Sequence, residues 1–200
     1  MKEIKFIDVE TTGLDPNKHE IIEIAIVPLE DGETFWHSYI KPERIEDASP
    51  KALEINGYAK NPHLWDNAPT LAEVAPTIRS WLLDSLPAGQ NIPFDMGFIQ
   101  AALAKYDLWR GISYHKLDVM TLAVEHLAPC GLTLFSLNNI CDFLGISNEG
   151  AHSALADAIR AKQVYKALAR ASKVDRFTWW AQNRVEGLFH ALLDFVGEKK

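Results

Sequence analysis

The sequence is poor in the features that cross-link a chain or hold it in a membrane. Its 200 residues contain two cysteines, Cys130 and Cys141, which do not form a CxxC motif. This excludes a disulfide framework and a cysteine-rich zinc site as the basis of the fold, and we predict two buried thiols in a reducing compartment. No apolar run approaches the roughly 20 residues of a membrane-spanning helix, and the N-terminal residues lack a secretory-signal pattern. We therefore predict a cytoplasmic protein without a membrane segment.

An excess of positive charge is also absent. The chain has 20 Lys and Arg against 27 Asp and Glu, a formal net charge of −7. This balance disfavours a protein that coats nucleic acid through a broad basic surface. It is compatible with an enzyme that grips only the end of a chain and uses bound cations as its positive charge.

Apolar periodicity predicts an α/β fold. Strand-like patterns occur at residues 2–9, 21–29, 34–40 and 88–92. Helical patterns occur at residues 50–55, 70–86, 94–106, 117–127, 133–144, 153–171 and 174–196. Thr70 is a candidate cap of the second helix, and Pro76 a break or kink inside it. Strands at the start, followed by alternating strand and helix, indicate a mixed sheet with helices on its faces.

The first candidate functional residues are two carboxylates at the end of the first strand. Side chains alternate along a strand, so Asp8 and Glu10 project to the same side, whereas Lys5 points to the other. Two neighbouring carboxylates without a cation repel each other, and a bound metal would relieve that repulsion. The alternative is an acidic strand end that faces water.

A second carboxylate segment begins a helix. Asp95 lies in the first turn of the helix predicted from Phe94, where the exposed backbone amides and the helix dipole favour an acid for structural reasons alone. Asn91 is a candidate turn residue. Phe94 and Phe98 lie one turn apart and are candidates for the core.

The third segment combines an acid and a histidine. On a helical wheel Asp157 lies in line with apolar residues of the same helix, namely Ala161, Val164 and Leu168. A carboxylate on a face that packs inward is costly unless it meets a cation. His152 falls on another side of the wheel, so we place it in the loop after Gly150, where it is suited to act as a general base.

Three motifs in these segments resemble the DEDDh branch of the DnaQ-like 3′→5′ exonucleases. DVETTGL at residues 8–14 matches the family pattern DxETTGL, and HSALADA at residues 152–158 matches HxAxxDA. GQNIPFD at residues 89–95 departs at Gln90, where relatives usually have His. The similarity covers about residues 4–168 and implies a ribonuclease H-like fold with a five-stranded mixed central sheet.

The resemblance also implies a mechanism. Asp8, Glu10, Asp95 and Asp157 would hold two divalent cations, Mg²⁺ or Mn²⁺, and His152 would take the proton of the water that attacks the terminal phosphodiester. The product would be a nucleoside 5′-monophosphate. Residues at matching positions contact the terminal nucleotide: Thr11, Thr12, Gly13, Leu14, Asn91, Phe94 and, more loosely, Asn56.

The C-terminal part divides the chain into a predicted exonuclease domain at residues 1–172 and a helical extension, packed on it, at residues 173–200. The helix at residues 153–171 also carries a basic stripe, which continues into the extension: Lys162, Lys166, Arg170 and Lys173. The stripe points away from Asp157, so it is either a solvated face or a secondary contact for nucleic acid or a partner protein. The apolar face of the helix predicted at residues 174–196 favours packing on the domain's own core. Trp179 and Trp180 add aromatic surface suited to a homodimer or a polymerase contact.

Three functions remain open at this stage. The first is an exonuclease acting on the single-stranded 3′ end of DNA or RNA. The second is a catalytically silent nucleic-acid or polymerase assembly module on the same fold. The third is a phosphodiesterase acting on small nucleotides.

Overall fold

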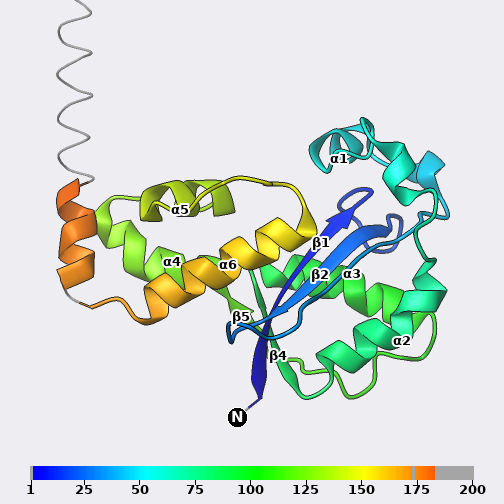
Figure 1. Cartoon of the computed structure of the whole chain (residues 1–200), viewed down its shortest axis with the longest axis horizontal. Helices are drawn as coiled ribbons and strands as arrows, with labels where there is room; N and C mark the ends of the chain where they lie inside the picture. The colour runs from blue at the N-terminus through cyan, green and yellow to red at the C-terminus, as the bar shows by residue number, and fades with distance from the viewer. Residues whose placement is uncertain (1, 173, 183–200) are drawn as a thin grey trace, which may run out of the picture.

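The computed structural model describes residues 2–172 and 174–182, and within them the chain forms a five-stranded mixed sheet (Figure 1). The strand order is β3-β2-β1-β4-β5. β1 pairs antiparallel with β2 and parallel with β4. The strands are β1 (Glu3–Thr11), β2 (Ile21–Pro28), β3 (Trp36–Tyr39), β4 (Ser85–Gly89) and β5 (Leu117–Asp118).

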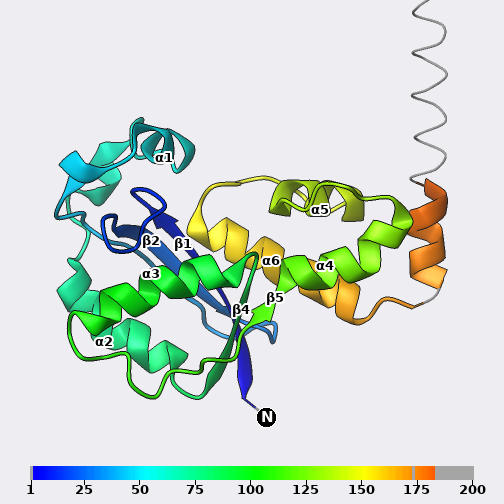
Figure 2. The ribbon, with the colours of Figure 1, turned by 180° about the vertical axis from the view of Figure 1, so that it is seen from behind.

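Helices cover both faces of this sheet, as Figures 1 and 2 show from opposite sides. α2 (Leu71–Leu82) and α3 (Ile92–Ala104) pack on one face. The other face carries α4 (Val119–Leu127), α5 (Leu137–Leu144) and α6 (Ala154–Ala169). The short α1 (Pro50–Ile55) lies near the end of β1, and three 3₁₀ turns complete the described elements: Ile45–Asp47, Pro62–Trp65 and Ala128–Cys130.

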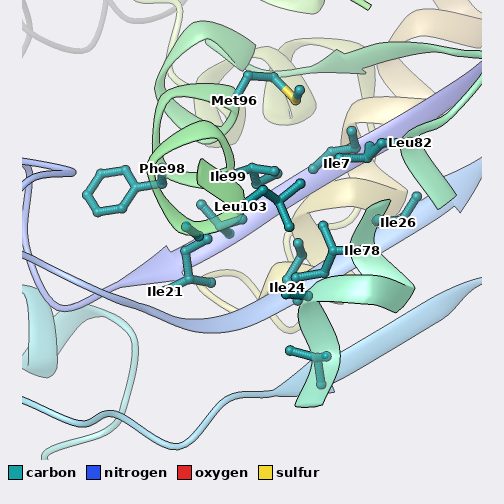
Figure 3. Close-up of a cluster of buried hydrophobic side chains, with 14 of the residues drawn as sticks. Ile7, Ile21, Ile24, Ile26, Ile78, Leu82, Met96, Phe98, Ile99 and Leu103 are labelled. Carbon is teal, nitrogen blue, oxygen red and sulfur yellow. The ribbon is translucent and has the colours of Figure 1, made fainter. Parts of the chain in front are cut away.

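Because the sheet is covered on both faces, β2, which lies next to the central strand β1, shows no alternation of buried and exposed residues. All eight residues of β2 are buried. Ile24 and Ile26 pack toward α2 and α3 (Figure 3), whereas Ala25 and Val27 pack toward α6. Burying each large aliphatic side chain contributes about 1.5–3 kcal/mol. The two cores therefore fix β1 and β2 firmly, and these strands carry the candidate site.

Several predicted boundaries are confirmed. α1 has the predicted bounds, and Thr70 caps α2 in a capping box with Glu73. The sheet and its flanking helices agree with the predicted fold class. Cys130 and Cys141 are buried free thiols, as expected.

Other boundaries are wrong. α2 ends at Leu82 and not near residue 86, because Leu83 is extended and Asp84 adopts a left-handed backbone with φ 57° that turns the chain into β4. The predicted fourth strand is accordingly shifted, and Ile92 already belongs to α3. Leu117 and Asp118 form β5 and not the start of a helix. Two residues are too few to show an alternating pattern, so this strand was not predictable from periodicity.

The described part of the extension is helical at residues 174–182. Trp179 is partly buried against the core beneath α4 and α6, and Cys130 Sγ lies 3.4 Å from the backbone oxygen of Arg176. Lys173 and the predicted helical residues 183–196 lie outside the described residues. Across residues 2–172 and 174–182, no helix is both long and apolar enough to span a membrane.

Candidate active site

Three of the candidate carboxylates meet where α6 crosses β1. Asp8 and Glu10 lie opposite Ala25 and Glu23 of β2, which places them on the face of the sheet that α6 covers. Asp157 lies in the first turn of α6. One ligand atom from each of Asp8, Glu10 and Asp157 can be chosen such that all lie within 4.8 Å of one another. The structure thus brings together two of the three segments that the sequence singled out.

Asp95 approaches the same strand from α3. It is buried, and its Oδ1 accepts a hydrogen bond of 3.0 Å from the backbone amide of Val9, between Asp8 and Glu10. Asp95 does not belong to the group of ligand atoms within 4.8 Å. Its charge nevertheless acts on both Asp8 and Glu10, so all four acids form one electrostatic unit.

The acids disfavour one another's ionised forms. Burial, together with the charges of Asp95, Asp157 and Glu10, raises the pKa of Asp8 well above its usual value. Burial and the charge of Asp157 raise the pKa of Glu10 to about 8. Burial raises the pKa of Asp95 to about 8 although the Val9 amide opposes the shift. A bound cation would reverse this balance, because it favours the ionised form of every acid around it.

His152 precedes α6, as predicted, and its backbone lies at the acidic cluster. Its amide donates to Asp157 Oδ1 at 3.3 Å, while the residue as a whole is exposed. Its backbone is left-handed, with φ 70°. This conformation is uncommon for a residue other than glycine, and structures keep it where the surroundings hold it in place.

Arg160 is the partner of Asp157 that sequence reasoning missed. The pattern identified Asp157 as an acid on an apolar face but treated it as unpaired. In the structure Arg160, 3% exposed, forms an ion pair of 2.5 Å with Asp157 Oδ1 and also donates to Asn138 and Asn148. The i, i+3 spacing of the two residues was the available signal.

The basic stripe on α6 is in part a structural contact, which corrects the expectation of a solvated or nucleic-acid-binding face. Lys162 is buried and donates to the backbone oxygen of Glu30. Lys162 and Lys166 both pair with Asp31 in the turn between β2 and β3. Arg170 is exposed. An acid on a distant turn therefore binds two of the four residues, and a helical wheel cannot represent such a contact.

A pocket of about 290 Å³ opens beside the acidic cluster. Its lining includes Glu10 and five of the predicted substrate contacts, which are Thr11, Gly13, Leu14, Asn56 and Phe94. Leu14 is 81% exposed, so its apolar side chain is accessible to a ligand in the pocket. Sequence reasoning did not include Ser49, Lys51, Ala52 and Ile55, which come from α1 and the residue before it and also line the pocket.

Three of the residues predicted to contact substrate have structural roles. Asn56 is buried, and its Nδ2 donates to the backbone oxygen of Thr11 at 3.0 Å, which ties the end of α1 to the end of β1. Thr12 is 1% exposed, and its Oγ1 accepts from the amide of Glu20. Asn91 has a left-handed backbone before α3, and its backbone amide donates to Asp118 Oδ1. Neither Thr12 nor Asn91 is part of the pocket lining.

Comparison with known proteins agrees with this geometry. A family model described as exonuclease (RNase_T) matches residues 6–165. The PolC-type DNA polymerase III of Thermotoga maritima is 33% identical over 161 residues, which are 80% of this chain and 11% of that protein. The epsilon subunit of DNA polymerase III from Rickettsia typhi is 32% identical over 171 residues, which are 81% of this chain and 72% of that subunit.

Solved structures show the same fold. E. coli exonuclease I in complex with single-stranded DNA superposes with a TM-score of 0.73 at 21% identity, over 90% of this chain and 42% of the exonuclease. Exonuclease I from Methylocaldum szegediense gives a TM-score of 0.70 at 23% identity, over 88% of this chain and 42% of that one. The fold is ribonuclease H-like, as predicted. The chain spans only about a tenth of the PolC-type polymerases that it matches. With the family model matched over most of its length, the chain belongs to the DnaQ-like exonuclease family.

Proposed function

We propose that the protein is a DEDDh exonuclease that removes nucleotides from the 3′ end of a single-stranded nucleic acid and releases nucleoside 5′-monophosphates. The observation that carries this proposal is the meeting of Asp8, Glu10 and Asp157 within 4.8 Å, beside a pocket that contains Glu10 itself. A substrate end in the pocket would lie against the acids. Membership of an exonuclease family supports the same reaction class.

The acidic cluster fits divalent cations. Carboxylate oxygens are the ligands that Mg²⁺ and Mn²⁺ prefer. Burial and the charges of neighbouring acids raise the pKa of both Asp8 and Glu10, and a cation among them would favour their ionised forms. We assign Asp8, Glu10 and Asp157 as the principal ligands of two such cations and Asp95 as an additional acid of the same site. When bound, the cations supply activation of water and stabilisation of the departing oxygen.

His152 is the proposed general base. Its backbone amide donates to Asp157, which places the residue beside the acidic cluster, and the residue is exposed to solvent. From there it can take a proton from the attacking water and pass it to bulk solvent. The acids cannot perform this task while they bind cations, because their ionised oxygens are then occupied.

The pocket is the proposed site of the terminal nucleotide. Leu14 and Phe94 offer apolar surface for a base, and Thr11 and Gly13 line the pocket beside Glu10. Lys51 is the one cation in the described pocket lining, and it is suited to a phosphate of the bound strand. Thr12 and Asn91 would act indirectly, because their hydrogen bonds to Glu20 and Asp118 hold the chain segments beside the pocket in place.

Residues 1–172 form the proposed catalytic domain and residues 173–200 its extension. The packing of Trp179 on the core supports an extension docked on the domain. The relatives named DNA polymerase III, together with the DNA-bound exonuclease I structures, favour single-stranded DNA and a polymerase partner. RNA remains the alternative substrate.

Degradation of 5′-labelled single-stranded DNA and RNA oligonucleotides tests the proposal. With Mg²⁺ or Mn²⁺ we expect a ladder that shortens from the 3′ end, and loss of the ladder with EDTA or in Asp8→Ala. Asp66→Ala, a change at an exposed acid outside the site, is the matched control and should retain activity. A folded protein that cleaves neither polymer would refute the proposal and favour an assembly module or a small-nucleotide phosphodiesterase.

A further inference from the structure

One buried acid has no place in the proposed mechanism. Glu23 is 2% exposed and is the only charged residue of β2, a strand in which every residue is buried. An unsatisfied carboxylate in such a strand would cost several kcal/mol, so its partners are informative. Its partners come from two elements that lie far from it in the sequence.

The pairing of the strands brings Glu23 next to the acidic site. Glu23 lies opposite Glu10 on one side and opposite Tyr39 of β3 on the other. Its Oε1 receives two hydrogen bonds, one from His37 Nε2 at 2.9 Å and one from Ser153 Oγ at 3.0 Å. We refer to Glu23, His37 and Ser153 as the Glu23 cluster.

Ser153 directly follows the proposed base and precedes α6. A serine in this position usually accepts a hydrogen bond from a backbone amide of the first helical turn, which stabilises the start of the helix. Ser153 makes no such bond; its hydroxyl donates to Glu23 instead. The usual stabilisation of the helix start is therefore absent, and the turn is tied to β2.

The turn needs holding because of the backbone of His152. With φ 70° it lies in the left-handed region, which is strained for a residue other than glycine. Two contacts oppose its relaxation: the His152 amide binds Asp157, and the neighbouring hydroxyl of Ser153 binds Glu23. The first contact fixes the turn to the metal-ligand cluster, and the second fixes it to the sheet.

We propose that Glu23 is a positioning residue for His152 and acts through the hydroxyl of Ser153, while His37 orients its carboxylate. This inference rests on the proposed function, in which His152 is the general base. A general base must lie within hydrogen-bond reach of the proton that it takes, and a displacement of about 1 Å can lower turnover about 100-fold. The Glu23 cluster keeps His152 in its left-handed backbone and hence within that reach.

The test is a double-mutant cycle between Ser153→Ala and His152→Ala, measured at saturating Mn²⁺ under steady-state conditions with the labelled oligonucleotide in excess over enzyme. We expect Ser153→Ala to lower kcat about 10- to 100-fold with KM changed less than about threefold. In the His152→Ala background the same change should cost less than about twofold, because the residue through which it acts is already gone. Ser153→Thr, which retains the hydroxyl, should restore most of the activity.

The control is Ser147→Ala, a change at an exposed serine of the preceding loop, which should leave kcat within about twofold of wild type. Glu23→Ala should likewise cost little more once Ser153→Ala is present, provided that circular dichroism shows a folded protein. Equal effects of Ser153→Ala and Ser147→Ala, or an effect of Ser153→Ala that is undiminished without His152, would overturn the inference. Failure of the proposed function is recognised separately, because the wild type would then cleave neither polymer; failure of the proposed role of His152 would appear as a His152→Ala variant as active as wild type, and in either case the inference would fall with it.

Discussion

Replacing Glu10 by glutamine should stabilise the metal-free protein and at the same time remove its activity. The substitution keeps the shape of the side chain and deletes its charge. Deleting the charge removes one acid from a group that repels itself, but it also removes a proposed cation ligand. If Glu10 served only to stabilise the fold, its replacement by glutamine would instead lower the stability of the metal-free protein.

The size of the effect follows from the pKa of Glu10, which burial and the charge of Asp157 raise from 4.5 to about 8. A shift of that size corresponds to at most about 5 kcal/mol of differential stability between the two protonation states. Glu10 is partly exposed, so solvent screening and relaxation reduce this figure, and we expect about 2 kcal/mol at pH 8. For a domain of this size that raises the melting temperature by about 4–8 °C.

The sign of the pH dependence follows from proton binding. Between about pH 4.5 and 8 the folded metal-free protein holds a proton on Glu10 that the unfolded chain has released. The stability of the wild type therefore falls as pH rises through this window, with its full value reached only below the unfolded pKa. The advantage of Glu10→Gln should accordingly be small near pH 5 and largest at pH 8.

Differential scanning fluorimetry or calorimetry in EDTA at pH 5 and pH 8 measures the gain in melting temperature of Glu10→Gln and its dependence on pH. Glu125→Gln, a change at an exposed helical acid, is the matched control. Added Mn²⁺ should then raise the melting temperature of the wild type more than that of Glu10→Gln. A Glu10→Gln protein that is equally or less stable than wild type in EDTA at pH 8 would refute the account of the site as a repelling acidic cluster.

Three further predictions concern the metal, the support of Asp157 and the packing beneath the site. The affinity for Mn²⁺, measured by calorimetric titration, should rise from pH 6 to pH 8 with release of protons, because the raised pKa values of Asp8 and Glu10 keep these acids protonated at the lower pH. A pH-independent affinity would contradict this prediction. Arg160→Leu breaks a buried ion pair with Asp157 and should lower the free energy of unfolding of the metal-free protein by about 3 kcal/mol. Added Mn²⁺ should restore part of this loss, and unchanged stability in EDTA would contradict the prediction. Gly89→Ala places a Cβ 2.7 Å from the backbone oxygen of Ile7 and should cost about 1–3 kcal/mol in urea unfolding, with Gly97→Ala, which meets open space, as the control; equal effects would contradict the steric argument.

The part of the site that was predictable from sequence depends on local periodicity. Alternation along β1 placed Asp8 and Glu10 on one face, and a helical wheel placed Asp157 on the inward face of α6. Thr70 was recognisable as a cap because capping is a contact between near neighbours in the chain. Each of these inferences needed only a few consecutive residues.

What was missed depends on contacts between segments that are distant in the sequence, or on elements too short to show a period. The pairing of Lys162 with Asp31 spans more than a hundred residues, and the bond of Ser153 to Glu23 does so as well. β5 consists of two residues. In β2 the pattern predicted only an apolar strand and did not single out Glu23, because the partners of Glu23 are set by strand register and by the docking of α6.

The missed contacts have one consequence in common, which is that they fix α6 on the sheet at both ends of its packed surface. Ser153 binds Glu23 near the start of the helix, whereas Lys162 and Lys166 bind Asp31 further along it. The acidic cluster between Asp157 and β1 repels itself and works against this packing in the metal-free protein. Such a repelling cluster stays preorganised for cations only if other contacts prevent α6 from moving away from the sheet. These polar contacts, together with the apolar packing of α6 on the sheet, supply that restraint.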